Sequence, residues 1–141
     1  MGKMIIDASN LILGRMGSKI AKKALLGEQI DIVNCEMAVI TGNRKQILLS
    51  YMQKKELGQP TKGPFMQRQP DRFVRRSIRG MLPYKQEKGR NAYSRIKCWV
   101  GVPEAFKDQK MESISEANIS KLPNLRFITI KELCRQIGGK I

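Results

Sequence analysis

Residues 4–33 read MIIDASNLILGRMGSKIAKKALLGEQIDIV, and they indicate the class of fold. The stretch opens with the apolar run 4–6 and closes with Ile30-Asp31-Ile32-Val33, and both segments are typical of short strands. Between them, apolar side chains at three- and four-residue spacing predict an amphipathic helix over 13–26. That spacing is formed by Leu13, Met16, Ile20 and Ala24. A strand, a helix and a second strand in this order predict a parallel strand pair.

The rest of the chain continues this alternation. Further strands are expected at 39–40, 98–100 and 126–128. Further helices are expected at 44–55, 71–82 and 86–95, and after Thr129, which forms a capping box with Glu132. Glycines and prolines in residues 57–70 predict a loop. The 141 residues therefore predict a single domain of the α/β class with a mainly parallel sheet.

Positive charge is concentrated in one part of the chain. The formal net charge is +15, and residues 60–97 alone contribute eleven Lys and Arg against Asp71 and Glu87, a net charge of +9. Such a density of like charge repels itself in a free protein. It is relieved when Lys and Arg neutralise the phosphates of a polyanion and release its counterions. The expected partner is a nucleic acid.

The predicted helix over 71–82 has two different faces. Val74, Ile78 and Met81 follow the spacing of a buried stripe. Arg72, Arg75, Arg76 and Arg79 share another side, where no carboxylate is in register. Arginine binds phosphate with two parallel hydrogen bonds and stacks on bases, so this face fits RNA better than a lipid surface. The alternative is an ordinary solvated face.

Aromatic residues are interleaved with these cations. Phe65, Phe73, Tyr84 and Tyr93 all lie inside the basic region. Some of them are expected to stack on unpaired bases, and at least two are expected to pack inside the protein. We predict that Phe65 and Tyr84 are the more exposed pair.

Several chemistries are not expected from this sequence. It has no histidine, and its three cysteines are far apart, so neither a metal site nor a disulfide framework is predicted. No nucleotide-binding glycine loop occurs, and we predict that Gly14 and Gly17 allow close packing where a strand meets a helix. Asp7 is expected to be a turn residue rather than a catalytic acid. We therefore predict neither an enzyme nor a cofactor.

Targeting signals are also not expected. No apolar run approaches the roughly 20 residues that span a bilayer, and residues 1–10 lack the pattern of a secretion signal. The cysteines are expected to be reduced and mostly buried. These features predict a soluble, intracellular protein.

Several motifs resemble those of one known family, the universal large-ribosomal-subunit protein thirteen in its archaeal and eukaryotic form. The most specific is the run 79–83, Arg-Gly-Met-Leu-Pro, with Gly63-Pro64-Phe65 before it and Gly101-Val102-Pro103 after it. A second block is Asp7-Ala8 with Leu13-Gly14-Arg15. The chain departs from the family pattern at Gly17, Tyr84 and Cys98-Trp99. It stops at Ile141, without the long basic extension of eukaryotic members, which favours the archaeal type.

This resemblance implies a three-layer α/β/α domain with a mostly parallel four-stranded sheet and an extended basic loop and helix. It also implies binding to large-subunit rRNA, a role in early subunit assembly, and a location in the cytoplasmic ribosome beside other large-subunit proteins. No membrane or small-molecule partner is implied. The RNA-binding residues predicted within 60–97 are Lys62, Phe65, Arg68, Arg72, Arg75, Arg76, Arg79, Tyr84, Lys85, Lys88, Arg90 and Arg95.

Two other functions remain open from the residues alone. One is an enzyme of nucleotide or RNA metabolism built on a Rossmann-like sheet, which would need a phosphate-binding loop or a catalytic constellation. The other is a non-ribosomal regulator, because the same basic face could bind messenger RNA or DNA.

Overall fold

A three-stranded parallel sheet forms the centre of the molecule. In the computed structural model, which describes residues 2–140, the strand order is β1 (Lys3–Asp7), β2 (Gln29–Val33) and β4 (Ile96–Cys98). Ile5 aligns with Asp31, and Ile32 aligns with Cys98. Helix α1 (Leu13–Leu25) connects the first two strands. The parallel pair predicted from residues 4–33 is therefore confirmed.

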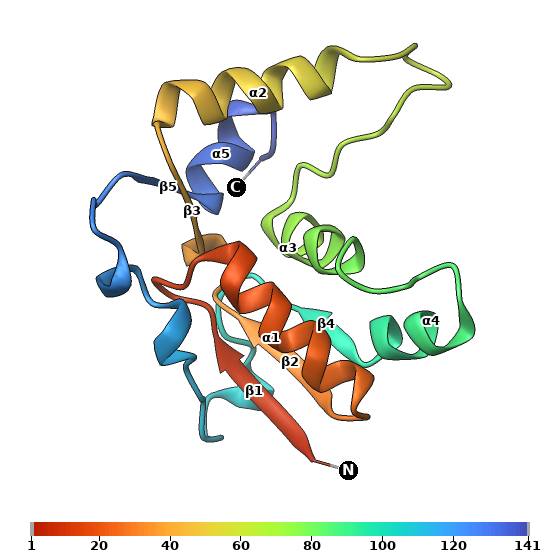
Figure 1. The fold of residues 1–141 in the computed structure, drawn as a ribbon, viewed down its shortest axis with the longest axis vertical. Coiled ribbons are helices and arrows are strands. Elements are labelled where there is room, and N and C mark those ends of the chain that lie inside the picture. Colours follow the sequence, from red (N-terminus) through yellow and green to blue (C-terminus); the bar gives the residue numbers. More distant parts are fainter. Residues whose placement is uncertain (1, 141) are drawn as a thin grey trace.

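Three helices lie on one face of this sheet. Helix α1 packs beside α3 (Pro70–Arg79) and α4 (Glu87–Ser94), as Figure 1 shows. The main core lies between these helices and the strands, and its members include Met16, Ile20, Ile32, Val74 and Ile78. This arrangement brings the two predicted amphipathic helices together over the parallel strands, with their apolar sides inward.

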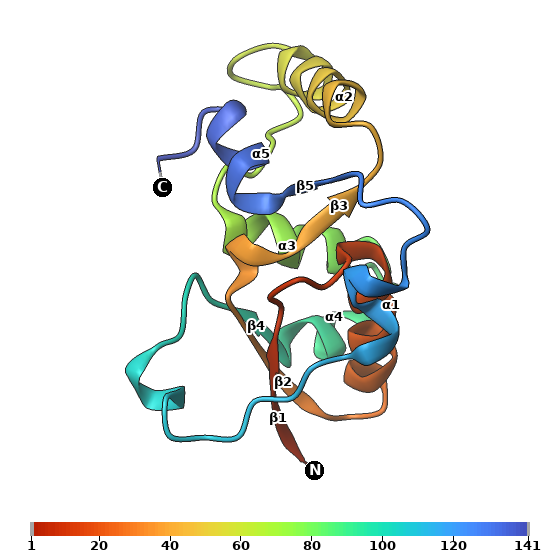
Figure 2. The same ribbon diagram turned by 90° about the vertical axis from the view of Figure 1, so that its left-hand side faces the viewer.

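The opposite face of the sheet has a different cover. Residues 102–112, which include the short helix η2 (Glu104–Phe106), run across it, and Phe106 packs against Ile5 and Val33. In Figure 2 this segment lies on one side of β1 and β2, while α1 and α4 lie on the other. The predicted three-layer α/β/α arrangement is not confirmed, because in the described residues a loop segment takes the place of the third layer.

The remaining strands form a separate pair. Strands β3 (Val39–Thr41) and β5 (Phe127–Thr129) are antiparallel, with Ile40 opposite Ile128. The prediction of one four-stranded sheet is therefore wrong for the described residues, although a strand does form close to 126–128. The chain leaves the parallel sheet after β2, where Asn34 adopts a left-handed conformation with φ of 55° and the turn η1 (Cys35–Met37) follows.

Two further helices complete the upper part of the molecule in Figure 1. They are α2 (Arg44–Glu56) and α5 (Ile130–Gln136), and they lie at the end opposite the N-terminus. The short helices η3 (Ser115–Ala117) and η4 (Ile119–Lys121) lie in the connection to β5. The Thr129 hydroxyl accepts a hydrogen bond from the Glu132 backbone N–H and begins α5, as the capping motif predicts.

Helix α3 differs from its prediction at both ends. It begins with Pro70 rather than after an Asp71 cap, because a proline lacks the N–H that the first turn leaves unpaired. It ends at Arg79 instead of continuing to Leu82. As a result Met81 is 40% exposed, and the prediction that it belongs to the buried stripe is wrong.

The first glycines of α1 have different surroundings. Gly17 is buried, and a Cβ there would lie 2.9 Å from the sulfur of Met81, which confirms close packing. Gly14 is exposed with no neighbouring atom within 4 Å, so the same prediction is wrong for Gly14. Asp7 acts as a turn residue, as predicted, and accepts hydrogen bonds from the Ser9 N–H and the Asn34 amide, both at 3.0 Å. Burial tends to raise the Asp7 pKa, but these bonds lower it overall.

The three cysteines are free. Cys35 and Cys134 are buried, and Cys98 is partly buried. A hydrogen bond with the Cys35 thiol, together with burial, raises the pKa of Cys98 well above its ordinary value, and burial raises the pKa of Cys134 to about 12. Both groups are therefore neutral thiols at pH 7.

Residues 2–140 contain neither a membrane-spanning helix nor a cluster of metal-ligating side chains. None of the helices there combines the length and apolar character that crossing a membrane requires. Within the same residues, no three metal-ligating side chains are grouped where they could hold an ion.

Candidate nucleic-acid interface

The basic segment, residues 60–97, lies along one side of the molecule. It comprises most of the loop between α2 and α3, then α3, a turn over 80–86, α4 and the start of β4. Figure 1 shows these parts following one another down a single side, from the loop beyond α2 to α4. A region that is continuous in sequence is therefore also continuous on the surface.

The cations of this segment have no acidic partners in the described structure. The three ion pairs found within residues 2–140 join Lys3 to Asp31, Lys19 to Glu116, and Arg44 to Glu132. All six residues lie outside the basic segment. Its net charge of +9 is thus not neutralised by ion pairs with any described carboxylate. This is the state expected of a surface that binds a polyanion.

The four arginines of α3 divide into two kinds. Arg72 and Arg76, four residues apart, are exposed. Arg75 instead turns inward, and its Nε and Nη2 donate to the carbonyl oxygens of Ile96 (3.0 Å) and Tyr93 (3.2 Å). Its guanidinium also lies over the Tyr93 ring, 4.0 Å from the centroid. The predicted row of four outward guanidinium groups is therefore reduced, and Arg75 fastens α3 to the edge strand β4.

Two more predicted arginines contact the protein itself. Arg95 donates from Nη1 to the carbonyl oxygen of Ala24 (3.0 Å) in the last turn of α1. Arg79 lies over the Tyr84 ring, 4.6 Å from its centroid, and its buried Nε has no hydrogen-bond partner in the described structure. Arg95 therefore joins α4 to α1, whereas Arg79 covers one face of an exposed tyrosine.

The aromatic residues separate as the sequence predicts. Phe65 is 65% exposed and Tyr84 is 37% exposed. Phe73 is buried and contacts Tyr51 with ring centroids 5.4 Å apart, and Tyr93 is partly covered by Arg75. Exposure of the first pair and packing of the second pair are both confirmed. Whether the exposed rings stack on bases stays a prediction.

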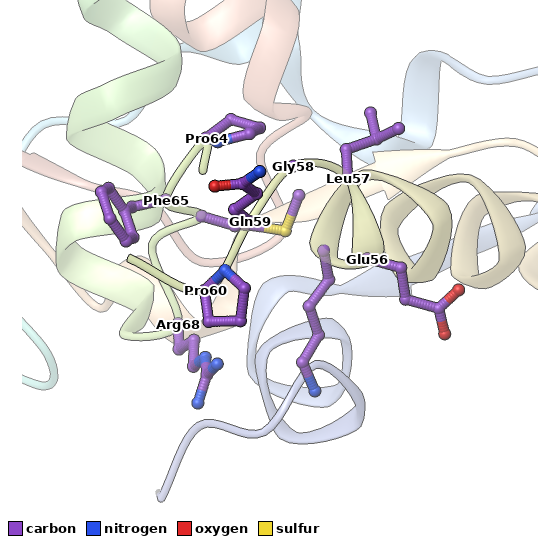
Figure 3. Close-up of a pocket in the computed structure, with 10 residues that line it drawn as sticks. Glu56, Leu57, Gly58, Gln59, Pro60, Pro64, Phe65 and Arg68 are labelled. Atoms are coloured by element: carbon purple, nitrogen blue, oxygen red, sulfur yellow. The ribbon is translucent and has the colours of Figure 1, made fainter. Parts of the chain in front are cut away.

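The loop that carries Phe65 borders a hollow beside the end of α2. Figure 3 shows Gln59, Pro60 and Phe65 around this hollow, with the Glu56 carboxylate directed away from the Arg68 guanidinium. The Arg68 Nη1 and the Lys55 Nζ both lie within 4 Å of the point that a Cβ on Gly138 would occupy. Two cations from separate elements thus meet beside the end of α5.

The same loop also borders a second hollow. Tyr51, Lys54, Phe65, Phe73 and Arg76 contribute to its walls. The Lys54 Nζ lies 4.7 Å from the centroid of the Tyr51 ring. The structure therefore brings Phe65 and Arg76 together, as expected of one binding surface, and adds cations from the last turn of α2.

The four remaining predicted cations are exposed and form no ion pair within residues 2–140. They are exposed residues of the loop, the turn and α4: Lys62, Lys85, Lys88 and Arg90. Lys54 and Lys55 on α2 line the two hollows although they are not among the predicted RNA-binding residues. Lys54 and Lys55 lie just before the loop in sequence, and this closeness was the signal that could have identified them.

Comparison with known proteins identifies the family. The family model of ribosomal protein L13 matches residues 2–105. The chain is 43% identical over 135 residues to "Large ribosomal subunit protein uL13" of Archaeoglobus fulgidus, which covers 95% of this chain and 86% of that protein. Proteins of the same name from Methanosarcina barkeri and Methanocaldococcus jannaschii are each 44% identical, covering 96% of this chain and 98% of theirs. The resemblance found in the motifs is thus confirmed, and the chain belongs to the ribosomal protein L13 family.

Proposed function

We propose that this chain is a structural component of the large ribosomal subunit, which binds large-subunit rRNA through its basic segment and supports early subunit assembly. Support comes from the names of its relatives and from the distribution of charge. The cytoplasmic ribosome is its proposed location, with rRNA and neighbouring large-subunit proteins as partners. The family is one of ribosomal structural proteins and not of enzymes, so the chain is not an enzyme.

One observation carries this proposal. No Lys or Arg of the basic segment is in an ion pair within residues 2–140, although the rest of the same chain forms three such pairs. Unpaired cations at this density repel one another in the free protein, and binding to a phosphate-rich partner relieves that repulsion. An RNA of fixed shape supplies phosphates along the whole length of the surface.

The proposed contacts follow from the direction of each side chain. The exposed cations would bind phosphates. They are Lys62, Arg68, Arg72, Arg76, Lys85, Lys88 and Arg90. Phe65 would stack on an unpaired base, and so would the free face of Tyr84, with Arg79 behind it. Arg75 and Arg95 would support this surface from within rather than contact RNA. Binding would depend on phosphate contacts and shape more than on base edges.

The first test is the location of the protein in cells. A lysate is separated on a sucrose gradient, the chain is detected by antibody, and the large-subunit fraction is separated again after a high-salt wash. We expect the chain in the large subunit before and after the wash. Recovery only in light fractions would contradict the ribosomal role and would favour a regulator that binds another nucleic acid.

A further inference from the structure

Trp99 lies immediately after β4 and is the single tryptophan of the chain. The residue is 38% exposed, although tryptophan is highly buried on average. The indole Nε1 donates a hydrogen bond to the Asp31 Oδ1 at 3.1 Å. The ring of Phe106 meets the indole edge to face, with centroids 6.0 Å apart and planes at 67°. Trp99 is therefore exposed but fixed at two points.

The anchor of this ring is itself unusual. Asp31 lies on the central strand β2 and is 6% exposed, the one charged side chain classed as buried among residues 2–140. Its other oxygen lies 3.7 Å from the Lys3 Nζ, and Lys97 is its neighbour in register on β4. Burial of a carboxylate is costly unless it is paired and hydrogen-bonded. Here Lys3 supplies the charge and the indole supplies the hydrogen bond, so the ring has a defined orientation.

Trp99 stands between two hollows that share Lys97. The first is about 280 Å³ and is lined by Lys3, Asp31, Arg95, Lys97 and Phe106, among others. The second is about 320 Å³ and lies at the free edge of β4, where Arg72, Arg75 and Asp71 contribute to its walls. Cations outnumber acidic groups around both hollows, and Asp31 is already paired with Lys3. The surroundings of the ring are therefore electropositive.

We infer that Trp99 is a stacking platform for an unpaired RNA base, with Lys97 and Arg72 binding the phosphates beside that base. This inference rests on the proposed function and adds a position outside the predicted segment. Every base has an aromatic face, and a rigid exposed ring binds it at little cost in conformational entropy. The flanking cations hold the sugar-phosphate backbone on each side. An apolar protein segment would leave those cations without a counter-charge, so RNA fits this surface better.

The position of the ring extends the interface around the molecule. Arg72 belongs to the outward side of α3 and also lines the second hollow with Trp99. In Figure 2 the end of β4 leads from the side of α3 toward the segment over the opposite face of the sheet. RNA that contacts α3 can therefore continue across the edge of the sheet to Trp99.

The test uses the intrinsic fluorescence of the intact chain. Because Trp99 is the only tryptophan, its emission reports this site alone. Purified protein is titrated with large-subunit rRNA and, separately, with heparin, a polyanion that has no bases. Binding of each is measured independently by filter retention. We expect a saturable loss of emission with rRNA and essentially unchanged emission with heparin at equal occupancy.

Two variants give a second readout. Trp99→Leu is expected to weaken rRNA binding by about 5- to 140-fold, the range found for loss of one stacked base. Trp99→Phe keeps an aromatic ring and loses the bond to Asp31, so its loss is expected to be smaller. Circular dichroism checks that both variants fold. The fluorescence titration of the unmodified protein needs neither variant, so it still decides the question if they do not fold.

The outcomes separate this inference from the proposed function. Binding of rRNA with unchanged emission and full affinity of Trp99→Leu would overturn the stacking role and leave the proposed function standing. Equal loss of emission with heparin would overturn it too, because charge alone would then explain the signal. Failure of rRNA to bind would instead contradict the proposed function itself.

Discussion

The two halves of the charge distribution satisfy their cations in different ways. Outside the basic segment, Lys3, Lys19 and Arg44 pair with the carboxylates of Asp31, Glu116 and Glu132. In the basic segment, the inward arginines Arg75 and Arg95 donate to backbone carbonyl oxygens instead. A carbonyl accepts a hydrogen bond without cancelling a formal charge. The segment can therefore be held in place while it keeps its full positive charge for a partner.

The arginines of α3 therefore have two roles that the sequence does not distinguish. Some hold the helix in place, and others are exposed to a partner. Arg75 and Arg76 are adjacent in the chain, yet one bonds to β4 and the other is exposed. Replacing every arginine of α3 together would therefore test folding and RNA binding at once. Experiments on this surface need variants that separate the inward group from the outward group.

The largest effect is expected from a methyl group added inside the basic segment. In Gly89→Ala, the new Cβ on α4 would overlap the carbonyl of Pro83 in the turn over 80–86. Because the carbonyl is backbone and the Cβ position is fixed by the backbone of α4, the turn and the helix must separate. We expect a loss of about 3 kcal/mol in the free energy of unfolding, measured by urea denaturation.

The matched change in the other part of the molecule is Gly14→Ala. That position is exposed on α1 and has no neighbouring atom within 4 Å. Alanine favours a helix over glycine by up to about 1 kcal/mol, so this variant is expected to be as stable as the parent or slightly more stable. Equal destabilisation by both variants would contradict the close approach of the turn to α4.

A smaller effect is expected from the inward arginine. Arg75→Met removes two hydrogen bonds and the contact with the Tyr93 ring. The Ile96 carbonyl on β4 and the Tyr93 carbonyl in the last turn of α4 then lose this donor. We expect this change to lower the free energy of unfolding by about 2 kcal/mol. Arg76→Met, at an exposed position, is expected to change it by less than about 0.5 kcal/mol. Urea denaturation of both variants measures the difference.

Equal stability of these two variants would break the distinction between inward and outward arginines. It would mean that the bonds from Arg75 to Ile96 and Tyr93 contribute nothing measurable. The side chain would then be available for RNA, as the sequence alone predicts.

The smallest effect is expected for the outward pair, Arg72 and Arg76, and it concerns the free energy of RNA binding. The double variant Arg72→Gln with Arg76→Gln should fold normally and bind large-subunit rRNA on the order of tenfold more weakly at about 0.15 M salt. The plot of log affinity against log salt should become less steep by about 1.5, the expected loss for two phosphate contacts. Filter binding at several salt concentrations measures both quantities.

The control for this variant removes the same charge elsewhere. Lys107 and Lys110 are exposed in the segment that covers the opposite face of the sheet. Their double replacement by Gln should change the affinity and the salt dependence much less. If the two double variants weaken binding equally, net charge rather than the outward face of α3 governs the interaction.

Much of the architecture could be predicted because its causes are local. The β1-α1-β2 unit follows from periodic apolar residues, and the ends of α1 and α5 follow from Gly27, with φ of 101°, and Thr129. The strand near 126–128 was also predictable, but its partner was not. A strand of three residues carries too little pattern to specify whether it joins the parallel sheet or pairs with β3.

The candidate site also has features that could be predicted from the sequence and features that could not. Exposure of Phe65 and burial of Phe73 agree with the predictions, and so does the continuity of the basic side. Burial of Asp31 beneath Trp99 was not predictable, since the two residues are 68 positions apart in sequence. No spacing rule relates residues at that distance.

The sequence by itself determined where the charge lies, where most helices and strands form, and which family the chain belongs to, because these depend on residue identity and short-range periodicity. Only the tertiary structure decided which arginines face outward. Arg75 reaches Ile96, 21 residues later, because α3 packs against the edge of β4, and Trp99 is oriented because β2 places Asp31 beneath it. Such contacts depend on how elements pack together, and that geometry is fixed only when the core closes.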